Sequence, residues 1–397
     1  MKRVYLDHAA ATPVRPEVMA AMLPFFTERF GNPSAVYDLG AQIKEVLEDQ
    51  RGKVARLIGA HPEEIIFTSS GAEANNLAVK GAALAHLNKG RHLIVSAIEH
   101  HSVMNSARFL EKFHDFEATF LPVTRYGLVE PERLQRALRP DTVLVSILHG
   151  SNEIGTIQPI KELAALCRAA GVLFHTDAVA TAGQTPIAVK DLGVDLLSLS
   201  GAALGAPKGI GALYFRPRLR LVPQIHGGIQ ENGRRAGTEN IPGIVGLGRA
   251  AELALEELAE KGPYLARLRE LLVTGIKERI SHVIYTGHPQ TRLPGHASFC
   301  LEGIEGEALL FMLSRQGIYA NTGSACASKA LKVSPVLCAI GLSPDVAQGS
   351  VVFTLNRDQG KDDIDYVLEH LPPAVERLRS FSPVWRKKMA AVAGGQS

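Results

Sequence analysis

Short apolar runs alternate with helical patterns through the middle of this 397-residue chain, and this alternation constrains the fold more than any other feature. Val, Ile, Leu and Phe dominate the runs, and several runs are bounded by Gly, Asp or Asn. Near-continuous apolar strands that alternate with helices indicate a mostly parallel sheet covered on both faces. The segments expected to form strands are residues 64–69, 92–96, 142–148, 172–176, 196–200 and 210–215.

The segments between these runs have the period of amphipathic helices. Residues 72–87 and 159–171 are the clearest cases. Pro159 stands where the first turn of a helix tolerates proline, and Gly171 stands where a helix often ends. The sequence therefore predicts an α/β protein.

The pattern changes near residue 250. Residues 251–280 predict one long helix, or two helices broken at Gly262–Pro263, and shorter strands and helices follow. We expect a large α/β domain over residues 14–257. The N-terminal segment is too short to fold alone, so residues 1–13 and 258–397 are expected to form a smaller α+β domain.

Composition excludes several classes of protein. Hydrophobic residues make up 46% of the chain and charged residues 21%, which rules out wholesale disorder. The net charge of +3 does not favour a nucleic-acid binder. No apolar run is long enough to span a membrane, and the N-terminus lacks the apolar stretch of a signal peptide. A cytoplasmic location is expected.

Polar side chains follow the predicted strands at their carboxyl ends, where open parallel sheets bind ligands. Each such residue is ordinarily a helix cap or turn residue, but together they describe one crevice. A helix that begins after Ser69–Gly71 would attract a phosphate, and Asp177 would pair with a protonated ring nitrogen. The other members of this set are Glu99, His100, His101, His149, Asn152 and Ser200.

Two glycine-rich stretches are predicted to be loops. Residues 201–215 lead from one strand into the next, and no G-x-G-x-x-G opens a helix, which argues against a nicotinamide site. Residues 226–240 are polar, and their adjacent arginines, Arg234 and Arg235, suit an anion or an ordinary surface loop.

None of the four cysteines forms a C-x-x-C pair, which leaves a zinc ribbon unsupported. Cys326 lies among small residues, and Lys329 and Lys332 would lower the pKa of its thiol. We interpret Cys326 as a reactive thiolate, against the alternative that it is inherited without a use. The other cysteines are assigned to packing: Cys167, Cys300 and Cys338.

Ordered motifs over residues 5–385 give the chain a clear resemblance to one family. The markers are YLDHAAATP, FGNPSAVY, EANNLAVKG, EHHSV, SNEIGTIQPI, HTDAVATAGQ, PKGIGALY, GGIQENGRRAGTEN, TGSACASK and FTLNRDQG. With these motifs the chain resembles the cysteine desulfurases, which are fold-type I pyridoxal-phosphate (PLP) enzymes of the class V aminotransferase group. The group implied is the one that serves iron–sulfur scaffolds and tRNA thiolation.

The resemblance implies a mostly parallel seven-stranded sheet and a role for each matching residue. His100 would stack on the PLP ring, where it is also a catalytic residue, and Asp177 would keep the ring nitrogen protonated. Ser200 would contact the phosphate, together with Gly71 and Ala72 at the strand-to-helix turn. Thr238 would reach the phosphate from the neighbouring subunit of a homodimer.

On the substrate side, the resemblance implies L-cysteine as the substrate. Arg357 would clamp the substrate carboxylate, and Asn152 would touch the cofactor or the substrate. Cys326 would attack the substrate sulfur and carry it away as a persulfide. The partner implied is an acceptor protein, either an iron–sulfur scaffold or a tRNA-thiolation protein, with no direct contact to nucleic acid.

The chain departs from the family pattern beside the cofactor. Ala203 stands where the Schiff-base lysine belongs, and Ala202 stands where its histidine neighbour belongs. Ala180 replaces a glutamine that contacts the ring hydroxyl, and Ala72 replaces a threonine that contacts the phosphate. Lys208 matches a second lysine of the pattern, so it is a poor substitute. Any bound PLP is therefore predicted to be held without a covalent link.

Three interpretations remain open from the sequence. The chain is a desulfurase that turns over without the lysine, or a non-catalytic partner in which Cys326 accepts sulfur or ligates a cluster. A class V transferase acting on another amino acid is the third interpretation.

Overall fold

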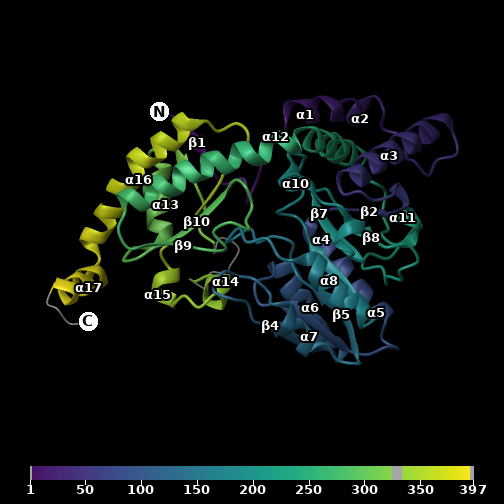
Figure 1. Ribbon diagram of the computed structural model, residues 1–397. Coiled ribbons are helices and arrows are strands. Elements are labelled where there is room, and N and C mark those ends of the chain that lie inside the picture. Colours follow the sequence, from purple (N-terminus) through teal and green to yellow (C-terminus); the bar gives the residue numbers. More distant parts are fainter. Residues whose placement is uncertain (1, 324–332, 394–397) are drawn as a thin grey trace.

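The computed structural model describes residues 2–323 and 333–393, and Cys326 lies outside this part of the chain. Within it, seven strands form the main sheet in the order β2-β8-β7-β6-β5-β3-β4 (Figure 1). Strand β8 is antiparallel to both neighbours, and the other pairs are parallel. The strands of this sheet are β2 (Ile65–Thr68), β3 (His92–Ser96), β4 (Glu117–Leu121), β5 (Thr142–Ser146), β6 (Leu173–Asp177), β7 (Leu196–Ser200) and β8 (Gly211–Phe215).

The smaller sheets lie in the other half of the molecule (Figure 1). Strand β10 (His296–Leu301) pairs antiparallel with β9 (Val283–Tyr285) and with β12 (Ser350–Thr354). Strand β1 (Val4–Tyr5) pairs parallel with β11 (Ile318–Tyr319). The N-terminal strand therefore joins residues more than 300 positions away, as the predicted small domain requires.

The helices cover both faces of the main sheet, and others pack against the small sheets. They are α1 (Pro16–Met22), α2 (Pro24–Thr27), α3 (Asp38–Leu57), the 3₁₀ turn η1 (Pro62–Glu64), α4 (Gly71–Asn76), the π turn η2 (Leu77–Gly81), α5 (Ala82–Ala85), α6 (His101–His114), α7 (Pro131–Ala137), α8 (Ile160–Ala169), α9 (Val189–Leu192), α10 (Gly201–Leu204), α11 (Gln230–Gly233), α12 (Ile241–Arg279), α13 (Gly306–Ser314), α14 (Pro335–Ala339), α15 (Pro344–Ala347), α16 (Lys361–Phe381) and α17 (Pro383–Ala393).

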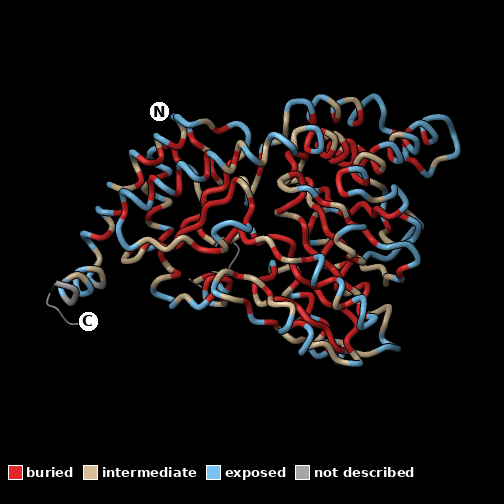
Figure 2. Tube along the Cα trace, in the orientation of Figure 1, coloured by how far each residue is buried: buried red, intermediate tan, exposed pale blue. Residues whose placement is uncertain are grey.

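The predicted strands are confirmed to within two residues at each end, and the α/β class is confirmed. Strands β2, β3, β5 and β8 are buried along their whole length, and β6 and β7 each have one half-buried terminal residue, because helices cover both faces (Figure 2). Strand β4 was not predicted. It lies at the sheet edge with only Leu121 buried, so it lacks the apolar run that identifies the other strands.

Helix α12 runs unbroken through Pro263 and links the two halves of the molecule (Figure 1). The alternative of two helices is therefore wrong. Its N-terminal half packs against α3 and α1, and its C-terminal half packs against α16. Separate apolar cores lie on either side, one containing Ile244 and Leu247 and the other Leu268 and Leu272. The exact domain boundaries, 14–257 against 1–13 and 258–397, stay a proposal.

In the part of the chain that the structure describes, none of the helices combines the length and the apolar character needed to cross a membrane.

Candidate functional site

Three segments converge at the carboxyl edge of the main sheet. Strand β6 ends at Asp177, β7 ends at Ser200, and the turn after β2 leads into α4 at Gly71. A Cβ atom on Gly71 would lie 2.6 Å from Cγ2 of Val179 and 3.3 Å from Cβ of Ser200. This close approach requires glycine at position 71. It brings the start of α4 against the residues that follow Asp177 and against Ser200, as predicted.

A chain of hydrogen bonds connects His100 to Asp177. The Nδ2 group of Asn75 donates to Oδ2 of Asp177 at 2.6 Å and to Oγ of Ser102 at 2.9 Å. Oγ of Ser102 lies 2.7 Å from Nδ1 of His100. The structure thus brings together two residues that the sequence placed in the site, through two that the sequence analysis did not single out. Asn75 and Ser102 stand in motifs that carry the family resemblance, EANNLAVKG and EHHSV, which was the available signal.

This chain of bonds assigns the tautomer of the neutral His100 ring. Nδ1 also accepts from the backbone N–H of Ser102 at 3.2 Å, so it acts as an acceptor. The proton of the neutral ring is therefore on Nε2. His100 is exposed and caps the N-terminus of α6.

Asp177 is a buried carboxyl that suits a cationic ring nitrogen. Burial raises its pKa, against the hydrogen bonds from Val179 N–H and Asn75 and the charge of His100, which lower it. No ion pair with Lys or Arg reaches Asp177 among residues 2–323 and 333–393. A pyridinium N–H would supply the missing positive charge. The ring end of the site therefore fits PLP.

Glu99 is a second buried carboxyl beside this site. Its Oε1 accepts from Oγ of Ser96 at 2.5 Å and from the N–H of Leu148 at 2.8 Å, and its Oε2 has no partner among the described residues. Burial raises its pKa from 4.5 to about 8, and Asp177 adds to the rise. Glu99 is therefore protonated in the folded protein at neutral pH.

We expect the Glu99→Gln variant to lose a specific pH dependence of stability. The wild-type folded state holds a proton that the unfolded state releases above pH 4.5, so stability falls as the pH rises toward about 8. The slope from one such proton is at most about 1.4 kcal/mol per pH unit. Urea unfolding of both proteins at pH 5 and pH 8 measures it. An equal change between the two pH values in wild type and variant would contradict this assignment.

The phosphate end of the site differs from the sequence-based expectation of an anion held by two adjacent arginines. The adjacent arginines of residues 226–240 are engaged within the chain: Nε of Arg235 lies 3.0 Å from Oε1 of Glu73, and Arg234 lies over the ring of Phe215. Neither is a free anion ligand in this arrangement. Thr238 and Ala72 are exposed, and Ser200 is half-buried.

The stretch from residue 201 was predicted to be a loop, and it contains the one-turn helix α10. Ala203 lies in this turn and is partly exposed, and Gly205 ends the turn with a φ of 81°. Lys208 is exposed, and its Nζ donates to the carbonyl oxygen of Thr12 at 3.3 Å. Lys208 is thus engaged with the N-terminal segment.

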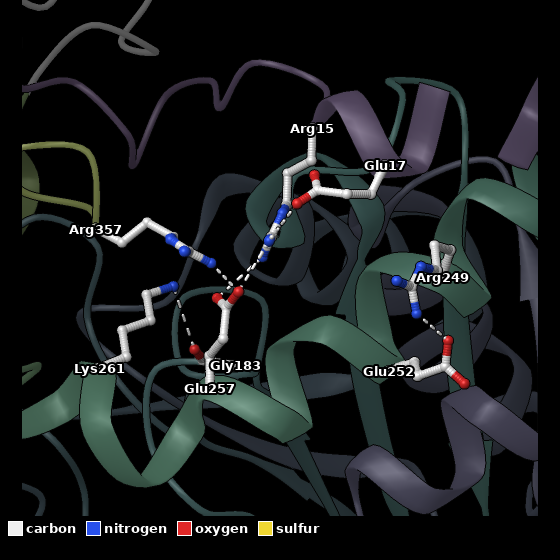
Figure 3. A network of polar contacts seen from close by, with 8 residues as sticks. All are labelled: Arg15, Glu17, Gly183, Arg249, Glu252, Glu257, Lys261 and Arg357. Carbon is white, nitrogen blue, oxygen red and sulfur yellow. Dashed lines mark hydrogen bonds and ion pairs between the residues drawn. The ribbon is translucent and has the colours of Figure 1, made fainter. Parts of the chain in front are cut away.

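Arg357 lies just beyond β12, and its guanidinium is paired with Glu257 of α12 (Figure 3). Arg15 holds both oxygens of the same carboxylate, at 2.8 and 2.9 Å. Asn152 is exposed, and its carbonyl oxygen accepts from Nε2 of His296 at 2.8 Å. The bonds that connect His100, Asn75 and Asp177 do not extend to these residues.

The cysteines divide by exposure. Cys167 and Cys300 are buried, and burial raises the pKa of both thiols to about 12, which agrees with their predicted packing role. The assignment of Cys338 to packing was wrong. This residue is exposed, because the short helix α14 buries Val336 and Leu337 and turns the next position outward.

Comparison with known proteins places this site in context. Residues 4–367 match the model of the family described as aminotransferase class-V. The chain is 49% identical over 387 residues to cysteine desulfurase IscS of Methanosarcina thermophila, covering 98% of this chain and 95% of that protein. It is 48% identical to cysteine desulfurase IscS of Dictyoglomus turgidum over 384 residues, covering 96% and 97%.

Solved structures agree with this relationship. A NifS-like protein superposes with a TM-score of 0.89 at 34% identity, covering 95% of this chain and all of the other. A structure described as SspA in complex with cysteine superposes with a TM-score of 0.79 at 36% identity, covering 89% and 98%. This chain therefore shares its fold, including the mixed seven-stranded sheet, with these structures over about nine-tenths of its length or more.

Proposed function

This chain belongs to the cysteine desulfurases of the class-V aminotransferase family, and from that membership we propose that it takes sulfur from L-cysteine onto Cys326 for delivery to an acceptor protein. The observation that carries the proposal is the buried Asp177 carboxyl, joined through Asn75 and Ser102 to His100. A buried carboxyl without a cation has a use if a protonated ring nitrogen binds there.

Each residue of the candidate site has a role in this proposal. Asp177 pairs with the ring nitrogen of PLP, His100 stacks on the ring, and Ser200, Gly71 and Ala72 lie toward the phosphate. Bound PLP supplies the electron sink that cleavage beside an amino-acid α-carbon requires. Asn75 fixes Asp177 and, through Ser102, the orientation of His100.

Sulfur transfer itself is the work of Cys326, with Arg357 and Asn152 holding the substrate. The thiolate of Cys326 bonds to the substrate sulfur while the bond between that sulfur and the substrate Cβ breaks. The carbon skeleton keeps the electron pair of the broken bond, takes up the proton that the substrate thiol gives up, and leaves as alanine. The protein keeps a persulfide, which an acceptor thiol can take up.

The cofactor is held without a covalent link in this proposal, because Ala203 has no amine and Lys208 donates to Thr12. Loss of a positioned general base costs about 10²–10⁴-fold in rate, so turnover is expected to be slow. The alanine at position 203 also favours a second function, in which Cys326 only accepts sulfur from another protein or ligates a cluster. Ala72, Ala180 and Ala202, which also lack polar groups, point in the same direction.

The acceptor and the assembly follow from the same relationship. We propose an iron–sulfur scaffold or a tRNA-thiolation protein as the acceptor, and a homodimer in which Thr238 of one subunit approaches the phosphate of the other. Exposure of Thr238 on the single chain is consistent with such a contact.

Incubation with PLP and L-[³⁵S]cysteine separates the two functions. A desulfurase releases more than one equivalent of alanine and carries ³⁵S on Cys326. A carrier releases no alanine, and it acquires ³⁵S only when a separate, active desulfurase is added. If Cys326 acquires label under neither condition, it neither takes sulfur from L-cysteine nor accepts it from another protein, and both sulfur-carrying functions fail.

We expect Cys326→Ala to remove the rapidly alkylated thiol and the transferred sulfur. In wild type, Cys326 should react with iodoacetamide at least about tenfold faster than Cys167 or Cys300, because burial keeps those two thiols protonated. Cys338 is exposed without a known task, so Cys338→Ala is the matched control. Unchanged sulfur transfer in Cys326→Ala, or its loss in Cys338→Ala, would contradict the assignment.

A further inference from the structure

Glu257 is the centre of a cluster of cations between the two halves of the molecule (Figure 3). Arg15 holds its two oxygens in a fork, and Arg357 donates to one of the same oxygens. The side chains of Arg15 and Glu257 are 18% and 23% exposed, whereas that of Arg357 is 50% exposed. The Arg15–Glu257 pair is thus the sheltered part of the cluster, and Arg357 is its open side.

The remaining charged groups do not compete for this carboxylate. Nζ of Lys261, one turn further along α12, points toward the carbonyl oxygen of Gly183 at 3.5 Å. Burial and the charge of Arg15 lower the pKa of Lys261 to about 8, and the charge of Asp358 partly offsets this by raising it. Nη2 of Arg15 lies 3.3 Å from Oε1 of Glu17, and among the described residues Glu17 forms no ion pair with Arg357. Glu257 is therefore the carboxylate that Arg357 contacts in this arrangement.

We propose that Glu257 is a specificity-determining residue that occupies Arg357 in place of the substrate carboxylate and must yield it when substrate binds. The inference rests on the proposed function, in which Arg357 is the carboxylate clamp. A guanidinium that leaves one carboxylate for another exchanges similar charge-assisted hydrogen bonds. The exchange leaves no orphaned charge, because Arg15 retains both oxygens of Glu257.

As a consequence, a ligand binds tightly only if its carboxylate replaces Glu257 as the partner of Arg357. A compound with a carboxylate at the right place recovers the contact that Arg357 gives up, whereas one without a carboxylate leaves Arg357 on Glu257. Glu257 therefore weakens the binding of every carboxylate ligand and sets how well that ligand must fit. It acts through Arg357 and does not touch the reacting atoms.

The test compares the binding of L-alanine and L-alaninamide to the full-length, PLP-loaded protein by calorimetry. The two probes share an amine and differ in the carboxylate, so the ratio of their affinities isolates the contact to Arg357. We expect Glu257→Gln to increase this ratio about threefold to tenfold, because a neutral amide holds Arg357 less strongly. Glu257→Gln keeps the size of the side chain and an acceptor for Arg15.

Glu252→Gln is the matched control, because Glu252 lies on the same helix and pairs with Arg249 (Figure 3). It removes an equal charge without touching Arg357, so it should leave the ratio unchanged. In an Arg357→Ala background, Glu257→Gln should leave the affinity ratio unchanged, because Glu257 acts on the ratio only through Arg357. The effect of Glu257→Gln in the wild type should therefore equal the interaction energy between the two residues in the double-mutant cycle.

The outcomes separate the inference from the function on which it rests. If Arg357→Ala leaves the ratio unchanged, Arg357 is not the carboxylate clamp and that part of the proposed function fails. If Arg357→Ala lowers the ratio but Glu257→Gln does not raise it, Glu257 is no competitor and this inference alone is overturned. An equal rise in Glu252→Gln would overturn it as well, because the effect would then be one of general charge.

Discussion

Under the proposed function, replacing Ala203 with lysine is expected to raise the rate of alanine release from L-cysteine by about 10²-fold or more, because the introduced amine would act as a general base. Ala203 lies in the one-turn helix α10 and is partly exposed, so a longer side chain should fit without displacing the core. Reduction with borohydride, digestion and mass analysis should find a pyridoxyl group on the introduced lysine. The same treatment of wild type should find none in residues 201–209.

Two variants control for a lysine placed anywhere near the site. Ala202→Lys puts the same side chain one position away on the same turn, and it should restore neither the rate nor the covalent link. Lys208→Ala should leave wild type unchanged, since Lys208 donates to Thr12. A pyridoxyl-lysine within residues 201–209 of wild type, or an equal rate in wild type and Ala203→Lys, would show that the chain needs no lysine at 203.

The parts of the fold that the sequence predicted are those with a local cause. Strands such as β3 and β5 are buried on both faces and therefore carry unbroken apolar runs. Strand β4 at the sheet edge and the glycine-rich turn α10 have no such local pattern, and both were missed. The exposure of Cys338 was missed because it depends on which side of α14 packs against the core.

The candidate site divides in the same way. Asp177 and Ser200 could be proposed from the sequence because each ends a strand, which is a local signal, and the structure confirms that position in the strand. Asn75 reaches Asp177 across 102 positions, and Glu257 reaches Arg357 across 100, so neither contact has a periodicity to reveal it. Such partners depend on the packing of helices α4 and α12, which a single sequence does not specify.

A further contact between distant residues, the buried ion pair of Arg51 and Glu231, is expected to contribute most to the stability of the site. Arg51 of α3 and Glu231 form a two-pronged ion pair at 2.8 Å, with side chains 8% and 3% exposed. Arg51 also donates to the carbonyl oxygen of Ile65, and Oε2 of Glu231 accepts from the N–H of Phe67. The pair thus ties residues 226–240 to strand β2, whose end leads into Gly71.

We expect Glu231→Ala to lower the free energy of unfolding by about 3–5 kcal/mol, because it leaves a buried guanidinium without its main partner. The N–H of Phe67 loses its acceptor in the same variant, which adds to the cost. Urea-induced unfolding followed by circular dichroism measures the change. Since 3 kcal/mol is a large fraction of the stability of a typical domain, the transition should move to clearly lower urea.

Glu130→Ala breaks the pair with Arg133, in which both side chains are 42% exposed, and it should change the free energy of unfolding by no more than about 0.5 kcal/mol. Replacing both members, as in Arg51→Met with Glu231→Leu, should recover much of the loss, since apolar side chains of similar size need no partner. If Glu231→Ala lowers the free energy of unfolding no more than Glu130→Ala does, the Arg51–Glu231 pair is not sheltered from water. A double variant as unstable as Glu231→Ala would mean that the hydrogen bonds to Ile65 and Phe67, rather than the buried charge, hold residues 226–240 against the sheet.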